Sequence, residues 1–430
     1  MKYSPIASTL FENNRKRLVS HLPKQSIALL NANDIMPTNA DGVFPFRQNN
    51  DLFYLSGIDQ EESILLLFPD AANQKEREIL FLKETNEHIA IWEGHKLSKK
   101  EATKLSGIAE VRWLSELDQS LDSLIPKATH IYLNQNEHAR ASKEIQTRDD
   151  RFRIALKQKY PLHQYDRLAP ILHQLRLIKS EEEIKQIRTA CNITEKAFRR
   201  VLSFMKDGKQ EYEVEAEILH EFLINKATGP AYQSIVASGK NACILHYIDN
   251  NKSCKAGDLV LMDFGAEYAN YASDLTRTIP VNGKFTERQK AVYQEVLSLL
   301  YDATSLLVVG NNFKDYRNAV AKKVEESLVR LSLITEEEIA HQDAKNPVYK
   351  KYFMHGISHF MGLDTHDVGS YDVSFQEGMV LTCEPGIYIP EEGIGIRLEN
   401  DILITKDGPV NLMENIPIEI EDIETLMNAL

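Results

Sequence analysis

The segment 259–280 constrains the fold most, because it places two aspartates within a predicted β-hairpin. Its first four residues are continuously apolar, which predicts a buried strand that ends at Asp263. Its second half alternates in character up to Pro280, as a partner strand would. With a turn at about residues 268–270, Asp263 and Asp274 lie nearly opposite each other on one face of the hairpin.

Two facing carboxylates in a sheet repel each other, so Asp263 and Asp274 need compensation. Either one of them is protonated, or a cation lies between them. The alternative is a pair of aspartates at strand ends that face the solvent. The hairpin by itself leaves these possibilities open, although it favours a metal site.

The composition is that of an ordinary soluble globular protein. The chain has 430 residues, of which 43% are hydrophobic and 26% charged, enough for two or three domains. Its longest strongly apolar run, residues 64–68, is far too short to span a bilayer, and its start lacks a signal-peptide pattern. We therefore expect a cytoplasmic protein with no membrane partner.

Charge and cysteine content argue against two further classes. The net charge of −13 argues against a nucleic-acid partner. The cysteines show no CxxC spacing, which argues against zinc knuckles and a disulfide framework. They are Cys191, Cys243, Cys254 and Cys383.

Residues 1–168 are expected to form an α/β domain with a mixed sheet. Short apolar runs predict buried strands at 26–31, 63–68, 78–82 and 130–133. Charged helical stretches, such as 10–22, lie between some of them, and this alternation favours an α/β arrangement. The chain becomes polar and basic at 145–165, which marks the end of the domain.

Residues 169–430 are expected to form a second domain with an approximate internal two-fold repeat. A capping-box pattern at Ser180 opens an amphipathic helix that we expect to end at Gly208. Further expected elements are helices at 212–225, 286–310 and 313–333 and strands at 378–384 and 393–404. The two halves share too little residue-level identity to form a sequence repeat.

Four further segments bring unusual polar residues to apolar strands or glycine-rich turns. They contain His246; His355, His359 and His366; Glu384; and Arg397 with Glu399, which share one face of a predicted strand. Each has an ordinary explanation by itself, such as a hydrogen-bonded core histidine, a strand end at a turn or a surface ion pair.

Taken together, the acidic residues favour a metal site. If Asp263, Asp274, Glu384 and Glu399 converge, their repulsion raises their pKa values unless cations balance it. Two divalent ions would neutralise the four charges. Oxygen ligands with one imidazole and no thiolate suit manganese, cobalt, iron or zinc. Two such ions form a catalytic arrangement that is found in aminopeptidases.

These segments resemble the pita-bread metallopeptidases, and most closely the aminopeptidase P (Xaa-Pro aminopeptidase) family. The resemblance covers nearly the whole chain. It rests on FPFRQNNDLFYLSG at 44–57, ILHY at 244–247, MDFGAEY at 262–268, YASDLTRT at 271–278, HGISH at 355–359, LDTHD at 363–367, CEPGIY at 383–388 and GIRLEND at 395–401. It implies an α+β protein in which an N-terminal α/β domain precedes a pita-bread domain, whose pseudo-two-fold helices surround a curved antiparallel sheet.

The resemblance also implies the site residues. The implied metal ligands are Asp263, Asp274, His359, Glu384 and Glu399, with Asp274 and Glu399 bridging two divalent ions, usually Mn²⁺. His246, His355 and His366 would bind the substrate backbone and stabilise the tetrahedral intermediate, Arg397 would orient ligands, and Glu384 would also transfer a proton. Asp41, Trp92 and Tyr388 would contact the substrate.

The implied activity is hydrolysis of the N-terminal Xaa-Pro bond of peptides by a hydroxide that bridges both ions. The alternative is a prolidase, which is restricted to Xaa-Pro dipeptides and has the same metal ligands. Only the resemblance of the N-terminal segment to aminopeptidase P separates the two. A pita-bread binding module without catalysis is a further alternative, which the complete ligand set disfavours. Relatives are commonly dimers or tetramers, so we expect a homodimer or homotetramer.

Overall fold

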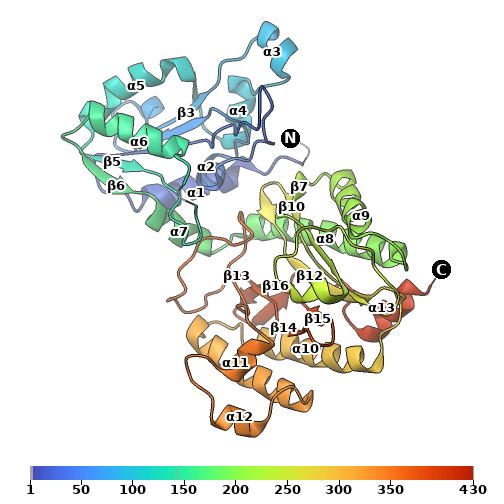
Figure 1. Ribbon diagram of the computed structural model, residues 1–430. Coiled ribbons are helices and arrows are strands. Elements are labelled where there is room, and N and C mark those ends of the chain that lie inside the picture. The colour runs from blue at the N-terminus through green and yellow to red at the C-terminus, as the bar shows by residue number, and fades with distance from the viewer. Residues whose placement is uncertain (1–2, 143, 430) are drawn as a thin grey trace. The chain divides into compact units, whose positions relative to one another are not determined.

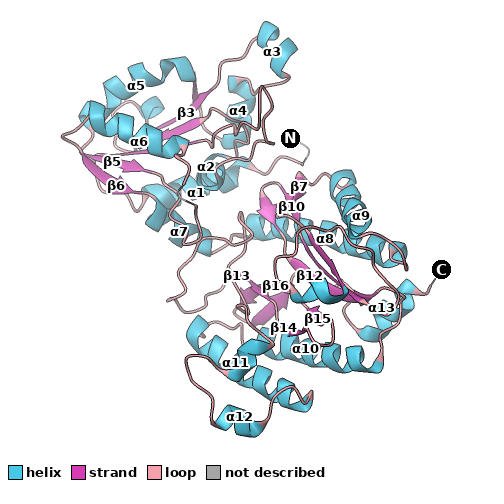
Figure 2. Ribbon diagram, in the orientation of Figure 1, coloured by secondary structure: helices cyan, strands magenta, loops and turns pink. Residues whose placement is uncertain are grey.

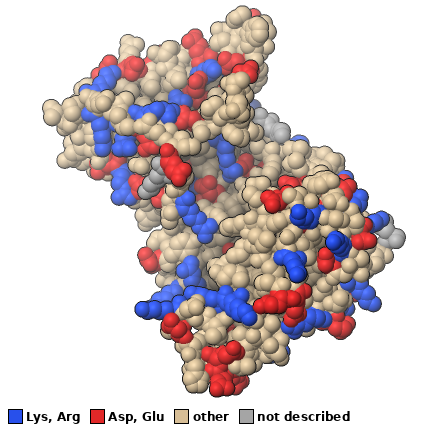
Figure 3. All heavy atoms as spheres, viewed as in Figure 1, with Lys and Arg blue, Asp and Glu red and all other residues tan. Residues whose placement is uncertain are grey.

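The computed structural model describes residues 3–142 and 144–429 and divides into two compact units, Tyr3–Arg176 and Leu177–Leu430 (Figure 1). Each unit contains both helices and strands (Figure 2). No helix within the described residues is long and apolar enough to cross a membrane. On the face drawn in Figure 3, acidic and basic side chains are interspersed.

The first unit is built on one six-stranded sheet with the order β4-β3-β2-β1-β5-β6. The strands are β1 (Ser26–Asn31), β2 (Ile64–Leu67), β3 (Glu78–Leu82), β4 (Glu110–Trp113), β5 (His130–Leu133) and β6 (Gln164–Arg167). The helices are α1 (Ser8–Val19), α2 (Asn50–Ser56), α3 (Glu87–Glu93), α4 (Lys99–Ser106), α5 (Leu117–Leu124), α6 (Arg148–Lys159) and α7 (Ala169–Leu177).

The expected mixed sheet is confirmed, because β1 pairs antiparallel with β2 and parallel with β5. Both β1 and β2 are buried at every position, which explains why Ile27–Leu30 and all of β2 are apolar without alternation. The predicted strands match β1, β3 and β5, and β2 lies inside the predicted 63–68. The predicted helix at 10–22 is displaced, since α1 begins at Ser8 and ends at Val19.

The second unit contains only antiparallel strand pairs among its described residues. Its strands are β7 (Gly229–Pro230), β8 (Ile235–Ser238), β9 (Leu259–Phe264), β10 (Ala266–Tyr268), β11 (Tyr271–Ala272), β12 (Leu275–Pro280), β13 (Val380–Cys383), β14 (Gly386–Ile389), β15 (Ile394–Arg397), β16 (Asn400–Thr405) and β17 (Gly408–Asn411). Its helices are α8 (Glu181–Phe204), α9 (Glu211–Ile224), α10 (Glu287–Ser305), α11 (Phe313–Arg330), α12 (Glu336–Ala340) and α13 (Ile420–Met427).

The predicted helix starts are more accurate than the predicted ends. The capping box at Ser180 opens α8, with its hydroxyl accepting from the Glu183 N–H. The helix ends at Phe204 rather than at Gly208, because Met205 is already extended and the glycine belongs to the following turn. Similarly, α10 ends at Ser305, short of the predicted residue 310.

The predicted hairpin is present, and its register places the two aspartates near each other on one face, although not directly opposite. Asp263 in β9 is paired with Thr276 in β12, so Asp274 lies two residues further along, on the diagonal. The turn is at Ala269 and Asn270, which both have positive φ values, as a tight two-residue hairpin turn requires. The two aspartates therefore meet at the strand ends, where the backbone stops pairing regularly.

The predicted strand at 393–404 is wrong as a single strand, because it is divided into β15 and β16. The link between them changes partners: the backbone N–H of Leu398 donates to Pro385, whereas that of Glu399 donates to Thr276. Since the chain changes partners here, Arg397 and Glu399 do not share the face of one strand. Their side chains instead converge on the Thr276 hydroxyl.

Candidate metal centre

Asp274, His359 and Glu399 come together in the second unit. One ligand atom from each lies within 4.8 Å of the others, and all three residues are buried. They come from three distant segments: the end of the β9–β12 hairpin, the irregular stretch before β13 and the link between β15 and β16. The cluster thus contains two carboxylates and one imidazole.

The orientation of His359 is set by its own backbone surroundings. Its Nδ1 lies 3.0 Å from the carbonyl oxygen of Phe360, which requires a proton on Nδ1 and leaves Nε2 toward the acids. Nε2 lies 3.5 Å from Asp274 and 3.7 Å from Glu384. A carbonyl partner on the far nitrogen is the usual arrangement of a metal-binding histidine.

The protein charges alone leave this cluster electrostatically unbalanced. Burial lowers the pKa of His359, but the facing carboxylates of Asp274 and Glu384 outweigh it and raise this pKa to about 9. Burial raises the pKa of Glu384 to about 7, against the opposing effect of His359. Burial and the charges of Asp274 and Glu384 hold the pKa of Glu399 well above its usual range.

Asp263 lies beside this cluster and has two polar partners. Its Oδ2 accepts a hydrogen bond from Arg397 Nη2 at 2.5 Å, and its Oδ1 lies 2.6 Å from the Tyr232 hydroxyl. The same hydroxyl lies 2.5 Å from Asp274. Burial raises the pKa of Asp263, with Arg397 opposing and Asp274 adding to this effect.

These residues fit a centre for divalent cations. The donor set has carboxylate oxygens and one correctly oriented imidazole, which suits hard or borderline ions. The carboxylates repel each other, and a cation would remove the cost that their raised pKa values report. The fit rests on this donor chemistry together with the burial of the cluster.

A second group of polar residues adjoins the acids. The Tyr388 hydroxyl lies 2.8 Å from His355 Nε2 and accepts a hydrogen bond from Arg397 at 2.9 Å. Burial and the Arg397 charge lower the pKa of His355 to about 3, with a further contribution from His246. At neutral pH His355 is therefore an uncharged hydrogen-bonding group.

The remaining predicted residues are distributed over both units. The ring of His366 packs edge-on against His359, with 4.3 Å between the centroids. His246 is exposed in the loop that precedes β9. Asp41 and Trp92 belong to the first unit, where Asp41 is exposed in a turn and Trp92 is 80% exposed on α3.

Two residues of the centre were missed by sequence reasoning. Tyr232 precedes β8 in a stretch without a distinctive pattern, so nothing in the sequence marked it. Thr276 is fully buried and joins Arg397 to Glu399, accepting from Arg397 Nε at 3.0 Å and donating to Glu399 at 2.7 Å. Its place in the polar alternation beside Asp274 could have identified it.

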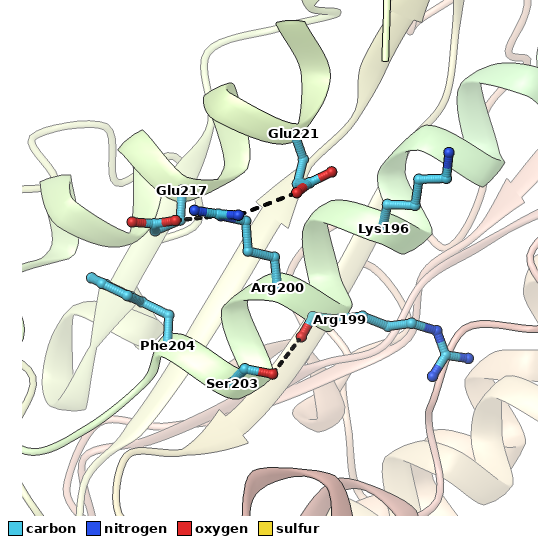
Figure 4. A pocket seen from close by; sticks show the side chains of 7 residues that line it. All are labelled: Lys196, Arg199, Arg200, Ser203, Phe204, Glu217 and Glu221. Carbon is cyan, nitrogen blue, oxygen red and sulfur yellow. Dashed lines mark hydrogen bonds and ion pairs between the residues drawn. The ribbon is translucent and has the colours of Figure 1, made fainter. Parts of the chain in front are cut away.

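A separate hollow of about 620 Å³ lies between α8 and α9 (Figure 4). Its charged side chains already have partners within the chain. Arg200 pairs with Glu217 and Glu221, and Lys196 donates to Asn225. The hollow is thus lined by satisfied surface ion pairs and differs from the buried, unbalanced acidic cluster.

Comparison with known proteins identifies the family. Residues 185–406 match the model of metallopeptidase family M24, and residues 11–132 match the aminopeptidase P N-terminal domain. The chain belongs to metallopeptidase family M24. The Xaa-Pro aminopeptidases of Escherichia coli and Haemophilus influenzae, which align with it over 99% and 97% of both chains, are 37% and 36% identical. These matches show a hydrolase of the Xaa-Pro aminopeptidase type.

Solved structures of this family confirm the expected fold. Aminopeptidase P from Escherichia coli, in a complex with the inhibitor Pro-Leu, has a TM-score of 0.87 at 36% identity over 99% of both chains. The aminopeptidase PepP of Pseudomonas aeruginosa has a TM-score of 0.90 at 33% identity over 99% of both chains. The α+β arrangement with a pita-bread domain is thus shared along the whole chain.

Proposed function

We propose that this protein is a two-metal-dependent aminopeptidase that hydrolyses the N-terminal Xaa-Pro bond of peptides. The observation that carries the proposal is the buried cluster of Asp274, His359 and Glu399, flanked by Asp263 and Glu384. The names of the full-length relatives support the choice of substrate. An M24 relative, a zinc-substituted Escherichia coli aminopeptidase P, has been solved with product.

Asp263, Asp274, His359, Glu384 and Glu399 would hold the two cations, with Asp274 and Glu399 shared between them. Mn²⁺ is the expected ion, with Co²⁺, Zn²⁺ or Fe²⁺ as alternatives. When bound, the two cations would polarise the scissile carbonyl group and make a water molecule acidic near neutral pH. The protein residues around them would then position the substrate and move protons.

Glu384 is the proposed proton carrier. Its carboxylate lies 3.7 Å from His359 Nε2 and 3.7 Å from His355 Nδ1, so it borders both the candidate ligands and the neighbouring histidines. It would take a proton from the attacking water and deliver it to the prolyl nitrogen. That nitrogen carries no hydrogen before cleavage, because an Xaa-Pro amide is tertiary, and it must gain one to leave.

Charge that develops on the carbonyl oxygen would be stabilised by the histidines around the acids. His246 and His366 are proposed as donors to this oxygen, and His355 as a group that binds the substrate backbone. Arg397 would hold Asp263 in place through their ion pair. The Tyr388 hydroxyl is bonded between His355 and Arg397, so its effect on the substrate would pass through those residues.

Asp41 and Trp92 are proposed to hold the free amino end of the substrate. We further propose a cytoplasmic homodimer or homotetramer with no nucleic-acid partner, consistent with the net charge of −13.

The deciding experiment compares cleavage of an X-Pro-Y tripeptide with cleavage of an X-Pro dipeptide, with Mn²⁺, Co²⁺, Zn²⁺ or Fe²⁺ added to chelator-treated protein. We expect metal-dependent release of X from the tripeptide and little dipeptide cleavage. A strong dipeptide preference would identify a prolidase instead. No cleavage with any ion, together with negligible bound metal, would rule out the catalytic proposal.

A further inference from the structure

The loop 244–252 carries His246 on an exposed, irregular stretch of chain. It follows the helical turn η4 (Gly239–Cys243) and leads toward β9. The neighbouring Tyr247 is buried in an apolar cluster that also contains Tyr388, whose hydroxyl lies 2.8 Å from His355 Nε2. An exposed loop side chain can be placed accurately only if the backbone around it is held.

Glu211, the first residue of α9, anchors this loop through hydrogen bonds to two of its residues. It is fully buried, and its Oε2 accepts hydrogen bonds from the Tyr247 hydroxyl at 2.7 Å and the Lys252 N–H at 2.9 Å. Its Oε1 accepts from the N–H and the hydroxyl of Ser238, at the end of β8. The backbone N–H of Glu211 donates in turn to the Lys252 carbonyl oxygen. One carboxylate thus joins a helix, a strand and both arms of the loop.

Asn250, in the loop, provides a second attachment to α9. It bonds to Glu215, which lies one turn after Glu211 on that helix. Its Nδ2 donates to Glu215 and to the Ser234 carbonyl oxygen, both at 2.9 Å, and its Oδ1 accepts from the Val236 N–H. Asn250 is 3% exposed and has a φ of 44°, a backbone conformation that asparagine tolerates better than most residues. Residues on both sides of His246 are therefore fixed to the start of α9 or to β8.

The Tyr247 ring connects this attachment to the candidate metal centre. It packs in a buried apolar cluster that includes Ile235, Leu261 and Tyr388. Tyr388 contacts His355 and Arg397 through its hydroxyl. The residue next to His246 thus belongs to the same buried cluster as the tyrosine that bonds to His355.

We propose that Glu211 and Tyr247 are positioning residues that fix His246 for its contact with the substrate. This inference rests on the proposed function. Neither residue would contact the substrate. Their hydrogen bond would act only by fixing the loop backbone, and thereby the position of the His246 imidazole. A small displacement of a group that contacts the reacting atoms costs rate, whereas binding of cations by other residues is unaffected.

The test is a double-mutant cycle of Tyr247→Phe and His246→Ala on the metal-loaded, full-length protein. We expect Tyr247→Phe alone to lower kcat about 5–20-fold with KM changed less than about twofold. In the His246→Ala background the same change should have no further effect, because the group being positioned is gone. Metal content should match the wild type, and hydrogen exchange should be faster at 244–252 only.

Tyr165→Phe is a matched control, since the Tyr165 hydroxyl donates to backbone carbonyl oxygens of Leu156 and Tyr160 in the first unit. It should leave kcat unchanged. Equal losses of kcat in both backgrounds, no loss in either, or an unchanged His246→Ala enzyme would each overturn the inference. Failure of the proposed function is distinguishable, because the wild type itself would then not cleave Xaa-Pro peptides.

Discussion

The Tyr232 hydroxyl lies 2.5 Å from Oδ1 of Asp274, and it also touches a second carboxylate, that of Asp263. A phenol has one proton, so it can donate to only one of these acids at a time. Burial and the two carboxylate charges raise the pKa of Tyr232 well above its ordinary value, which keeps the phenol protonated. Tyr232 therefore adjusts the electrostatic balance between two candidate ligands.

Replacing Tyr232 with Phe should weaken metal binding. The variant keeps the ring but removes the hydroxyl that lies between the two carboxylates, and loss of such a partner typically costs about 10–100-fold in metal affinity. Titration of chelator-treated protein with Mn²⁺ measures the change, with Tyr165→Phe as the control. An unchanged affinity would show that the hydroxyl does not orient the acids.

Asp274→Asn should abolish bound metal and peptidase activity together. An amide is a poorer ligand and cannot neutralise two cations. The metal-free fold should survive, because the change removes one of the charges that raise the pKa of Glu399. Elemental analysis and peptide cleavage, run on the same preparation, provide the measurement. Activity that survives the substitution would contradict the bridging role.

The metal-free protein should lose stability as pH rises from about 6.5 to 9. Burial lowers the pKa of His359, but the carboxylates of Asp274 and Glu384 have the larger effect and raise this pKa from 6.5 to about 9. Between these pH values the folded state therefore keeps a proton that the unfolded state releases. This contribution is complete below pH 6.5 and is lost as pH passes 9. Glu384, whose pKa burial raises to about 7, adds to the loss at the lower end. Burial lowers the pKa of His355 from 6.5 to about 3, so this residue makes stability rise with pH mainly below pH 6.5, where the unfolded state binds a proton that the folded state does not.

The expected loss is about 1–3 kcal/mol, measured by urea unfolding of chelator-treated protein at several pH values. His359→Gln should flatten the curve above pH 7.5. Added Mn²⁺ should reverse the slope, because cations compete with protons for the same ligands. Stability of the metal-free wild type that stays level or rises over this interval would refute the assignment.

Gly265→Ala should severely destabilise the second unit. A Cβ atom at this position would lie 1.7 Å from the Ser273 carbonyl oxygen on the opposite arm of the hairpin. We expect a cost of about 3 kcal/mol or more, because backbone cannot yield as a flexible side chain can. Gly229→Ala is the control, since nothing lies within 4 Å of its added Cβ. Thermal unfolding of both variants decides whether this close approach is required.

The hairpin and its two aspartates were predictable because apolar runs and alternation are local properties of a strand. The exact register was not, since it depends on the length of the turn: with only Ala269 and Asn270 in the turn, Tyr268 is opposite Tyr271 and Asp263 is opposite Thr276. The break between β15 and β16 was also hidden, because the residues on both sides of it remain buried and no glycine or proline marks the interruption.

The assembly of the centre depends on contacts that no local pattern contains. Tyr232 precedes β8, yet its hydroxyl meets side chains from the far end of the hairpin. The Thr276 hydroxyl forms hydrogen bonds with both Arg397 and Glu399, because the backbone changes its pairing partner at residue 398. Sequence reasoning reached the acids through the resemblance and their charge, and it missed the neutral hydroxyl groups that connect them.

The distance along the chain between Asp274 and Glu399 has a consequence for protein synthesis. The cluster needs both residues, so a nascent chain that ends before Glu399 cannot complete it. At ordinary translation rates, the ribosome needs on the order of ten seconds to make the intervening segment. During that interval the growing polypeptide carries Asp274 without Glu399, so the cluster stays incomplete until synthesis has passed residue 399.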